Sequence, residues 1–415
     1  DTASLDVCDP EPLPAGHWLY EHPKVFLTPH TSWAGPGAFD EIISTFHANY
    51  LRWRAGEPLD GVVDVDAGAC TQARGRRVPV AMHCSPDAQR PAHPQSMPFN
   101  AHFHAVAAEV RNWGGRGADD RLGTLNLLTD EAVAAGAATI RSGRRVPCAI
   151  DLSPNGPQIG SVPGRINPLR GMNYINNADL GDPDGNAMVP HFNDDHVVMG
   201  LQAGTHWDGL GHVSYDHHLY NGFPADSVTA LGGSTVLGIE NVRTLVGRGV
   251  LLDVAAMHQV EQLPGGHEIT GEELDETAEW AGVEIRPGDI VLIRSGRIRS
   301  FHAGGGLAYI MGPGGDASNP GPGLDACRWF HRNDIAAVAD DIMTFEVFPG
   351  PEPENMLAVH CLAIVDMGLT TGQIWDLEAL SAACADESRY EFFLAANPEP
   401  FVGGCGAPVS PVAVF

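Results

Sequence analysis

From about residue 196 to the C-terminus, short apolar runs alternate with segments of helical periodicity. The runs at 197–202, 248–254, 288–296 and 335–343 are rich in β-branched residues, which predicts strands. Segment 269–282 has helical spacing behind a threonine that is followed by a glutamate three positions later, the pattern of a capping box. This alternation predicts an α/β fold with a substantial sheet.

Two further helices are predicted ahead of these strands. Segment 103–113 has helical periodicity, and so does 128–143, for which Thr129 and Asp130 are both plausible N-caps. The glycine-rich stretch 303–323 is instead expected to form a mobile loop. It lacks the GxxxxGK[ST] and GxGxxG spacings, so we assign it no phosphate-binding role.

The N-terminal part of the chain has a different pattern. Residues 1–68 end in a helix-like segment at 37–59, and residues 69–98 have little periodicity and several Pro, Arg and Gln. We therefore expect a small helical and loop appendage over 1–68, a linker over 69–98 and the main domain over 99–415.

Composition narrows the class of protein. The 415 residues are 43% hydrophobic, enough for a real core, and no run approaches the length of a membrane span. The net charge of −28 argues against nucleic acid or anionic membrane as a partner. The first residues show no signal peptide and read as the middle of a strand, so we expect a truncated or processed start. Eight cysteines without a CxxC pair indicate reduced thiols in a cytoplasmic protein.

The segment LQAGTHWDGLGHVSYDHH, residues 201–218, concentrates the candidate chemistry. In a strand, His206 and Asp208 would point to the same face, and an imidazole with a carboxylate suits Zn²⁺ or Mn²⁺ better than Ca²⁺ or Mg²⁺. If a helix begins near Asp208, His212 lies one turn on, where it could act as a general base. The alternative is that the histidines are hydrogen-bonded core residues and Asp208 a helix cap, and spacing alone leaves both open.

The N-terminal segment 5–33 contains an "EP" turn followed by LTPH. It resembles the C-terminal end of D-isomer-specific 2-hydroxyacid dehydrogenases, and by that resemblance Glu11 and His30 match the acid and the proton-donating histidine. The cofactor-binding unit of that family would lie upstream of residue 1. We therefore expect a folded remnant that packs on the main domain or helps it associate, without dehydrogenase chemistry or a bound nicotinamide.

From Phe99 onward the chain resembles the cyclase family of metal-dependent hydrolases, which includes kynurenine formamidase and isatin hydrolase. The family signature is HxGTHxDxxxH, and residues 202–212 read QAGTHWDGLGH. Supporting matches lie at 112–126, 156–168, 220–222, 248–254, 287–296 and 403–415. The resemblance implies the family's swivelling β/β/α fold and a homodimer or homotetramer.

Position by position, the resemblance implies that His206 and Asp208 are metal ligands and that His212 is the base. It implies a further ligand at His360, in the run LAVHCLAIVDMG. The cofactor would be a divalent metal, Zn²⁺ or Mn²⁺, with one ion per chain.

This chain departs from the family pattern at two positions. Gln202 stands where the first signature histidine belongs, and Gln373 where the late glutamate is expected. Neutral amide oxygens bind cations more weakly than imidazole or carboxylate, which disfavours a second ion. Gln202 or water would complete the site, and Gln373 is a candidate to donate a hydrogen bond to one of the ligands.

Four other side chains are candidates for the pocket. His217 and His218 follow the signature and are expected at the pocket rim. Asp341 and Glu346 precede the run containing His360 and could line the pocket from a neighbouring strand, although capping or packing roles are equally compatible with their positions.

The resemblance implies hydrolysis of an amide, lactam or lactone bond in a small carbonyl substrate. Metal-activated water would attack the carbonyl while His212 takes up and returns the proton. The alternative, from a different class, is a non-catalytic, metal-poor scaffold or small-molecule binder of the same fold, which the two glutamine replacements favour. Metal content separates the two hypotheses.

Overall fold

The computed structural model describes residues 99–176 and 191–415, together with Arg52 and five short strands near the N-terminus. The chain divides into two compact units, Asp1–Ser96 and Met97–Phe415. In the first unit, β1 pairs with β2 in parallel and β3, β4 and β5 form an antiparallel sheet. Apart from Arg52, the predicted helix at 37–59 lies outside the described residues, as does most of the predicted linker. The five strands are β1 (Ala3–Leu5), β2 (Val25–Leu27), β3 (Val62–Asp64), β4 (Ala69–Thr71) and β5 (Val78–Pro79).

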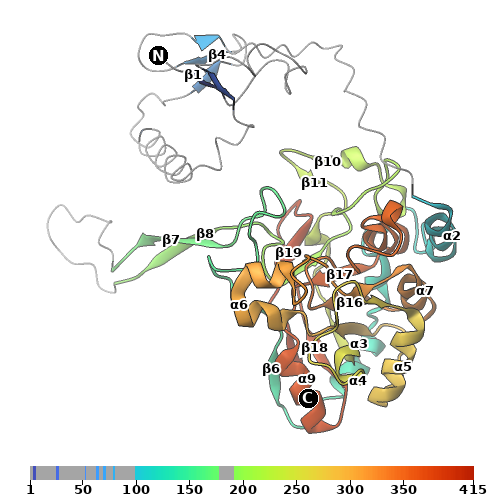
Figure 1. Cartoon of the computed structure of the whole chain (residues 1–415). Helices are drawn as coiled ribbons and strands as arrows, with labels where there is room; N and C mark the ends of the chain where they lie inside the picture. The colour runs from blue at the N-terminus through green and yellow to red at the C-terminus, as the bar shows by residue number, and fades with distance from the viewer. Residues whose placement is uncertain are drawn as a thin grey trace. The chain divides into compact units, whose positions relative to one another are not determined.

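The second unit is built around a nine-stranded sheet with the order β19-β9-β17-β16-β14-β12-β18-β20-β6 (Figure 1). Its four central strands, β12, β14, β16 and β17, run parallel to one another, and the outer strands pair antiparallel. The strands are β6 (Arg145–Pro147), β9 (His206–Asp208), β12 (Val246–Asp253), β14 (Ile290–Arg294), β16 (Ala337–Asp340), β17 (Thr370–Gln373), β18 (Glu391–Ala395), β19 (Gly406–Pro408) and β20 (Val412–Val414).

The predicted strands at 248–254, 288–296 and 335–343 are confirmed as the three adjacent central strands β12, β14 and β16. They are buried along nearly their whole length, as expected for parallel strands covered on both faces. The mixed α/β fold is thus confirmed. The strand predicted at 197–202 is only partly present, because β8 (Asp194–Val198) ends at the second residue of that run. This strand pairs with β7 (Leu169–Tyr174) in an exposed ribbon.

The predicted helices α2 (Ala101–Val110), α3 (Asp130–Ala137) and α5 (Gly271–Ala281) are present. The N-cap of α3 is Thr129, whose side chain accepts a hydrogen bond from the backbone of Ala132. In α5 only half of the predicted capping box forms: Thr270 accepts from the backbone of Glu273, whose carboxylate instead binds two histidines. In the described part of the chain, no helix is long and apolar enough to cross a membrane.

The expectation of a mobile loop at 303–323 was wrong. Its first half belongs to helix α6 (Ile298–Met311), which bends where Gly304 and Gly305 leave helical geometry. The helix persists because Tyr309 is fully buried in a small apolar cluster with Ile298 and Ile150, and burial of such a ring outweighs the low helix propensity of glycine.

Alternation along the central strands separates two apolar cores, one on each face of the sheet. Val250, Val291 and Val338 face the first core, whereas their neighbours Leu251 and Leu292 face the second. Helices α2, α5 and α7 (Leu324–Arg332) cover the first face and lie together on one side of the sheet in Figure 1. Helix α9 (Glu378–Glu387) contributes to the second core.

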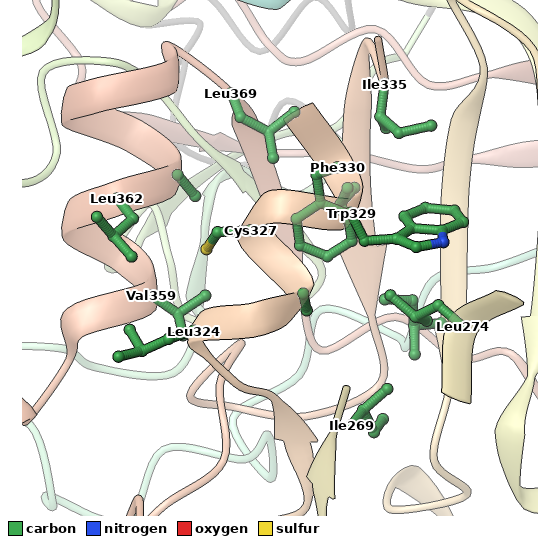
Figure 2. Packing of buried hydrophobic residues seen from close by; sticks show 14 of the residues in the cluster. Ile269, Leu274, Leu324, Cys327, Trp329, Phe330, Ile335, Val359, Leu362 and Leu369 are labelled. Carbon is green, nitrogen blue, oxygen red and sulfur yellow. The ribbon is translucent and has the colours of Figure 1, made fainter. Parts of the chain in front are cut away.

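Helix α7 forms the middle of the first core, as Figure 2 shows. Its Leu324 and Cys327 face the segment that carries Val359 and Leu362, and Trp329 extends toward Leu274 on α5. This core therefore fixes the segment around residue 360 against the sheet.

Replacing Leu274 with alanine should lower the free energy of unfolding by about 2–5 kcal/mol, because its fully buried side chain leaves a cavity beside Trp329. Urea-induced unfolding followed by circular dichroism measures the change. Leu307→Ala is the matched control, since Leu307 also lies in a helix but is 62% exposed, and it should change stability by at most about 0.5 kcal/mol. Equal losses in both variants would contradict the assigned core.

Candidate metal centre

Strand β9 places the signature residues on one face of the sheet. It lies between β17 and β19, with His206 opposite Gln373 and Asp208 opposite Gly406. Trp207 points into the second core, so His206 and Asp208 face the opposite side, toward the first core. The predicted i, i+2 arrangement in a strand is confirmed.

Two ligand atoms in this strand are buried without partners. The Nδ1 atom of His206 donates to the carbonyl of Gly204 at 2.7 Å, so the lone pair of the neutral ring lies at Nε2. His206 Nε2 lies 3.5 Å from Asp208 Oδ1, and neither atom has a hydrogen-bond partner among the described residues. Both side chains are fully buried. Two such acceptors, side by side and shielded from water, are costly unless a cation lies between them.

His360 approaches from the helical segment packed on this face. It ends α8 (Ala358–His360) and precedes a π-helical turn, η9 (Cys361–Met367). Its Nδ1 and backbone N both contact Glu346 Oε1, at 2.6 Å and 3.0 Å. A carboxylate on Nδ1 orients the ring and turns Nε2 toward the centre, as in carboxylate–histidine–metal arrangements.

Gln373 connects His360 with Asp208. Its Nε2 amide donates to Asp208 Oδ2 at 2.5 Å and lies 3.1 Å from His360 Nε2. A single amide group therefore separates the imidazole of residue 360 from the carboxylate of residue 208. His206 and Asp208 of strand β9 and His360 from a distant part of the chain therefore lie around one buried spot.

His212 lies at the edge of this spot. The segment after Asp208 forms a turn, in which the backbone N of His212 donates to Gly209, and not the helix considered from the sequence. Nevertheless, His212 Nε2 lies 3.6 Å from Asp208 Oδ1. Its side chain is 22% exposed, whereas that of Asp208 is fully buried, so His212 connects the centre with solvent.

The carboxylate and the imidazoles of the centre shift one another's pKa values. Burial opposes ionisation of Asp208, but His212, His206 and His360 outweigh it and hold its pKa well below the usual range. Burial lowers the pKa of His212, although Asp208 partly offsets this. The centre thus combines a permanent carboxylate with an imidazole that favours its neutral form.

Gln202 lies beside the same carboxylate. A side chain added at Gly406 would come within 2.8 Å of Gln202 Nε2 and 3.3 Å of Asp208 Oδ1, so both groups border the space above this glycine. Gly406 therefore keeps room for the amide next to Asp208.

The profile of the Cyclase family matches residues 102–347. The chain belongs to the cyclase family. A crystal structure of a novel cyclase shares 36% identity with it and a TM-score of 0.66, covering 74% of this chain and 99% of that one. Isatin hydrolase A from Labrenzia aggregata, bound to benzyl benzoate, is more distant, with 18% identity and a TM-score of 0.47 over 68% of this chain and 96% of that one.

The N-terminal resemblance to 2-hydroxyacid dehydrogenases is also supported. Glyoxylate/hydroxypyruvate reductase A from Serratia proteamaculans (strain 568) is 43% identical over 68 residues, which are 16% of this chain. The chain spans about a fifth of the length of the curated relatives it matches. Glu11 and His30 lie outside the described residues, so their arrangement stays a prediction.

Three other residues that the sequence suggested for the pocket of this cyclase-family chain have contacts outside the candidate metal centre. His217 and His218 belong to an exposed turn, in which His218 packs its ring on Trp113. Asp341 accepts hydrogen bonds from the backbone and hydroxyl of Ser295, and burial raises its pKa to about 6. These contacts give Asp341 a structural partner.

Two acids contribute more than the sequence indicated. Glu346, for which the sequence leaves lining, capping and packing roles open, orients His360. Asp340 was not singled out, yet it is fully buried on β16, bears on the charge of Asp208, and has an unpartnered Oδ2. Burial and the neighbouring Asp341 raise the pKa of Asp340 far above its usual value. The sequence could have indicated Asp340, because it is an acid at the end of an apolar run that predicts a buried strand.

In the described part of the chain, the ligand atoms of His258, His267 and Glu273 all lie within 4.8 Å of one another, a closeness that His206, Asp208 and His360 do not reach together. However, the Nε2 atoms of both histidines hydrogen-bond to the Glu273 carboxylate, so the polar atoms of this group are partnered without a metal. It links the C-cap of the short helix α4 (Val254–Met257) to the first turn of α5.

Replacing Asp208 with asparagine should lower the pKa of His212 further, because the variant removes the negative charge that stabilises its imidazolium. An NMR titration of the His212 ring in metal-free protein measures this shift. Asp216→Asn, at an exposed position in the same loop, should leave that pKa unchanged. A rise in the Asp208→Asn variant would show that the two groups do not interact as described.

Proposed function

We propose that this chain is a metal-dependent hydrolase that cleaves an amide, lactam or lactone bond in a small carbonyl substrate. The observation that carries the proposal is the buried pair His206 Nε2 and Asp208 Oδ1, which lack hydrogen-bond partners in the described structure and lie 3.5 Å apart. This separation is close to the ligand–ligand distance around a tetrahedral metal with bonds of about 2.0–2.2 Å.

The donor set suits one Zn²⁺ or Mn²⁺ ion. His206, Asp208 and His360 would supply two imidazole nitrogens and one carboxylate oxygen, with Gln202 or water completing the shell. Gln373 is neutral, so Asp208 is the one carboxylate that the proposed donor set takes from the described residues, which disfavours a second cation. Asp340 and Glu346 add carboxyl groups behind the ligands.

A bound ion of this kind supplies Lewis acidity, which lowers the pKa of coordinated water to about 7 and polarises a carbonyl. His212 is the base: it favours the neutral form, is reachable from solvent, and presents Nε2 to the centre. It accepts a proton at Nε2 as water attacks the carbonyl carbon, and it returns that proton to the leaving nitrogen or oxygen. Asp208, 3.6 Å away, stabilises the transient imidazolium.

One observation favours the alternative of a metal-poor binding protein. The Gln373 amide already contacts Asp208 and His360, so part of the centre is satisfied without a cation. Elemental analysis decides between the two functions, because the hydrolase requires about one ion per chain and the binder requires none.

The purified chain should hold about one Zn²⁺ or Mn²⁺ after dialysis against the metal, and His206→Ala should lose it. Glu346→Gln should weaken binding by about 10- to 100-fold, because the His360 ring loses the carboxylate that orients it. Calorimetric titration and elemental analysis measure affinity and stoichiometry. Glu354→Gln, an exposed neighbour of the same chemistry, should bind as the native chain does.

His212→Ala should reduce kcat by about 10²- to 10⁴-fold on any responsive member of a panel containing acetanilide, dihydrocoumarin and 4-nitrophenyl acetate, because it removes the proton acceptor. Metal content should be retained, which separates loss of the base from loss of the ion. His217→Ala, at an exposed position, should keep native kcat. Full activity in His212→Ala would rule out its role as base.

A further inference from the structure

The guanidinium of Arg165, near the centre, makes no hydrogen bond or ion pair with the described residues. Among the described arginines that are buried or half-buried, it is the one in this situation. Arg248 and Arg294, by comparison, each contact two carboxylates. A half-buried, unpaired cation is unusual in a chain with a net charge of −28.

The loop that carries Arg165 is firmly closed on itself. The Asn167 side chain donates to the carbonyls of Pro154, Gly156 and Gln158 and accepts from the backbone of Gln158. The Asn167 side chain therefore fixes the backbone of this loop two residues from Arg165.

This loop docks on the segment that leads into β9. The Gly200 backbone donates to Ile166, and Gln158 Nε2 donates to the carbonyl of Ala203. A Cβ added at Gly200 would lie 3.3 Å from Arg165 Cγ, so the arginine stem runs along the backbone two residues before Gln202. Gln158 Oε1 is buried there without a partner.

The guanidinium lies close enough to the centre to act on its charges. Burial lowers the pKa of Arg165, and Asp208 opposes that shift. The positive charge of Arg165 in turn opposes protonation of His212 and His360. A guanidinium cannot ligate a metal, and it would repel one unless an anionic group lay between them.

We propose that Arg165 binds an anionic group, a carboxylate, of the substrate while the scissile carbonyl faces His206, Asp208 and His212. The proposal rests on the hydrolase function above and narrows its substrate to a small carbonyl compound that carries a carboxylate. The planar guanidinium matches the two carboxylate oxygens, and the unpartnered Gln158 Oε1 accepts a donor beside them.

The test compares benzoate with its neutral isostere benzamide in ligand-observed NMR titrations, on metal-free and metal-loaded full-length chain. Metal-free native protein should bind benzoate roughly tenfold more tightly or better, the range of a charge-assisted hydrogen bond in a desolvated site. Arg165→Met should remove this preference, Arg165→Lys should keep part of it, and Arg243→Met, at an exposed and unpaired arginine, should keep it fully.

The outcomes separate this inference from the hydrolase proposal. Equal binding of both probes by the native protein, or a preference that survives Arg165→Met, overturns the carboxylate site even if the chain binds its metal. An arginine-dependent preference in a chain that binds neither Zn²⁺ nor Mn²⁺ keeps the carboxylate site and removes the hydrolase.

Discussion

The packing of Trp207 in the second core is the constraint on which the centre depends. This side chain is fully buried, lies 4.9 Å from Trp375 ring to ring, and donates its indole N–H to the carbonyl of Ala396. Because side chains alternate along a strand, a one-residue slip would turn the tryptophan out of its core and move both signature ligands to the wrong face. The large apolar ring thus sets the register that His206 and Asp208 require.

The first core fixes the other half of the centre. His360 follows Val359, which packs against α7, and its ring is held by Glu346. The two halves meet through Gln373, one strand away from β9. Both hydrophobic cores therefore hold the candidate ligands in place. Burial raises the pKa of Asp208, but the imidazoles of His212, His206 and His360 together lower it.

The family signature and the strand pattern allowed much of this to be predicted. Three buried central strands and three helices are predicted from the sequence and are present. His206, Asp208 and His360 lie around the Gln373 amide in the structure, and their role as metal ligands stays a prediction. The failures have local causes. Segment 303–323 was expected to be a loop because glycine weakens helices, but burial of Tyr309 retains helix α6. The capping box of α5 is incomplete because the carboxylate of Glu273 is taken by His258 and His267.

By itself, the sequence determined the α/β class, the identity of the central strands and the residue types available for a metal centre, since periodicity and composition are local properties. Only the tertiary structure decided which of the nearby acids and amides act there. Glu346 and Gln373 contact His360 and Asp208 across 13 to 165 positions of the sequence. Arg165 stands out because its guanidinium has no partner among the described residues. Such contacts depend on strand order and on the docking of loops, which residue spacing along the chain does not encode.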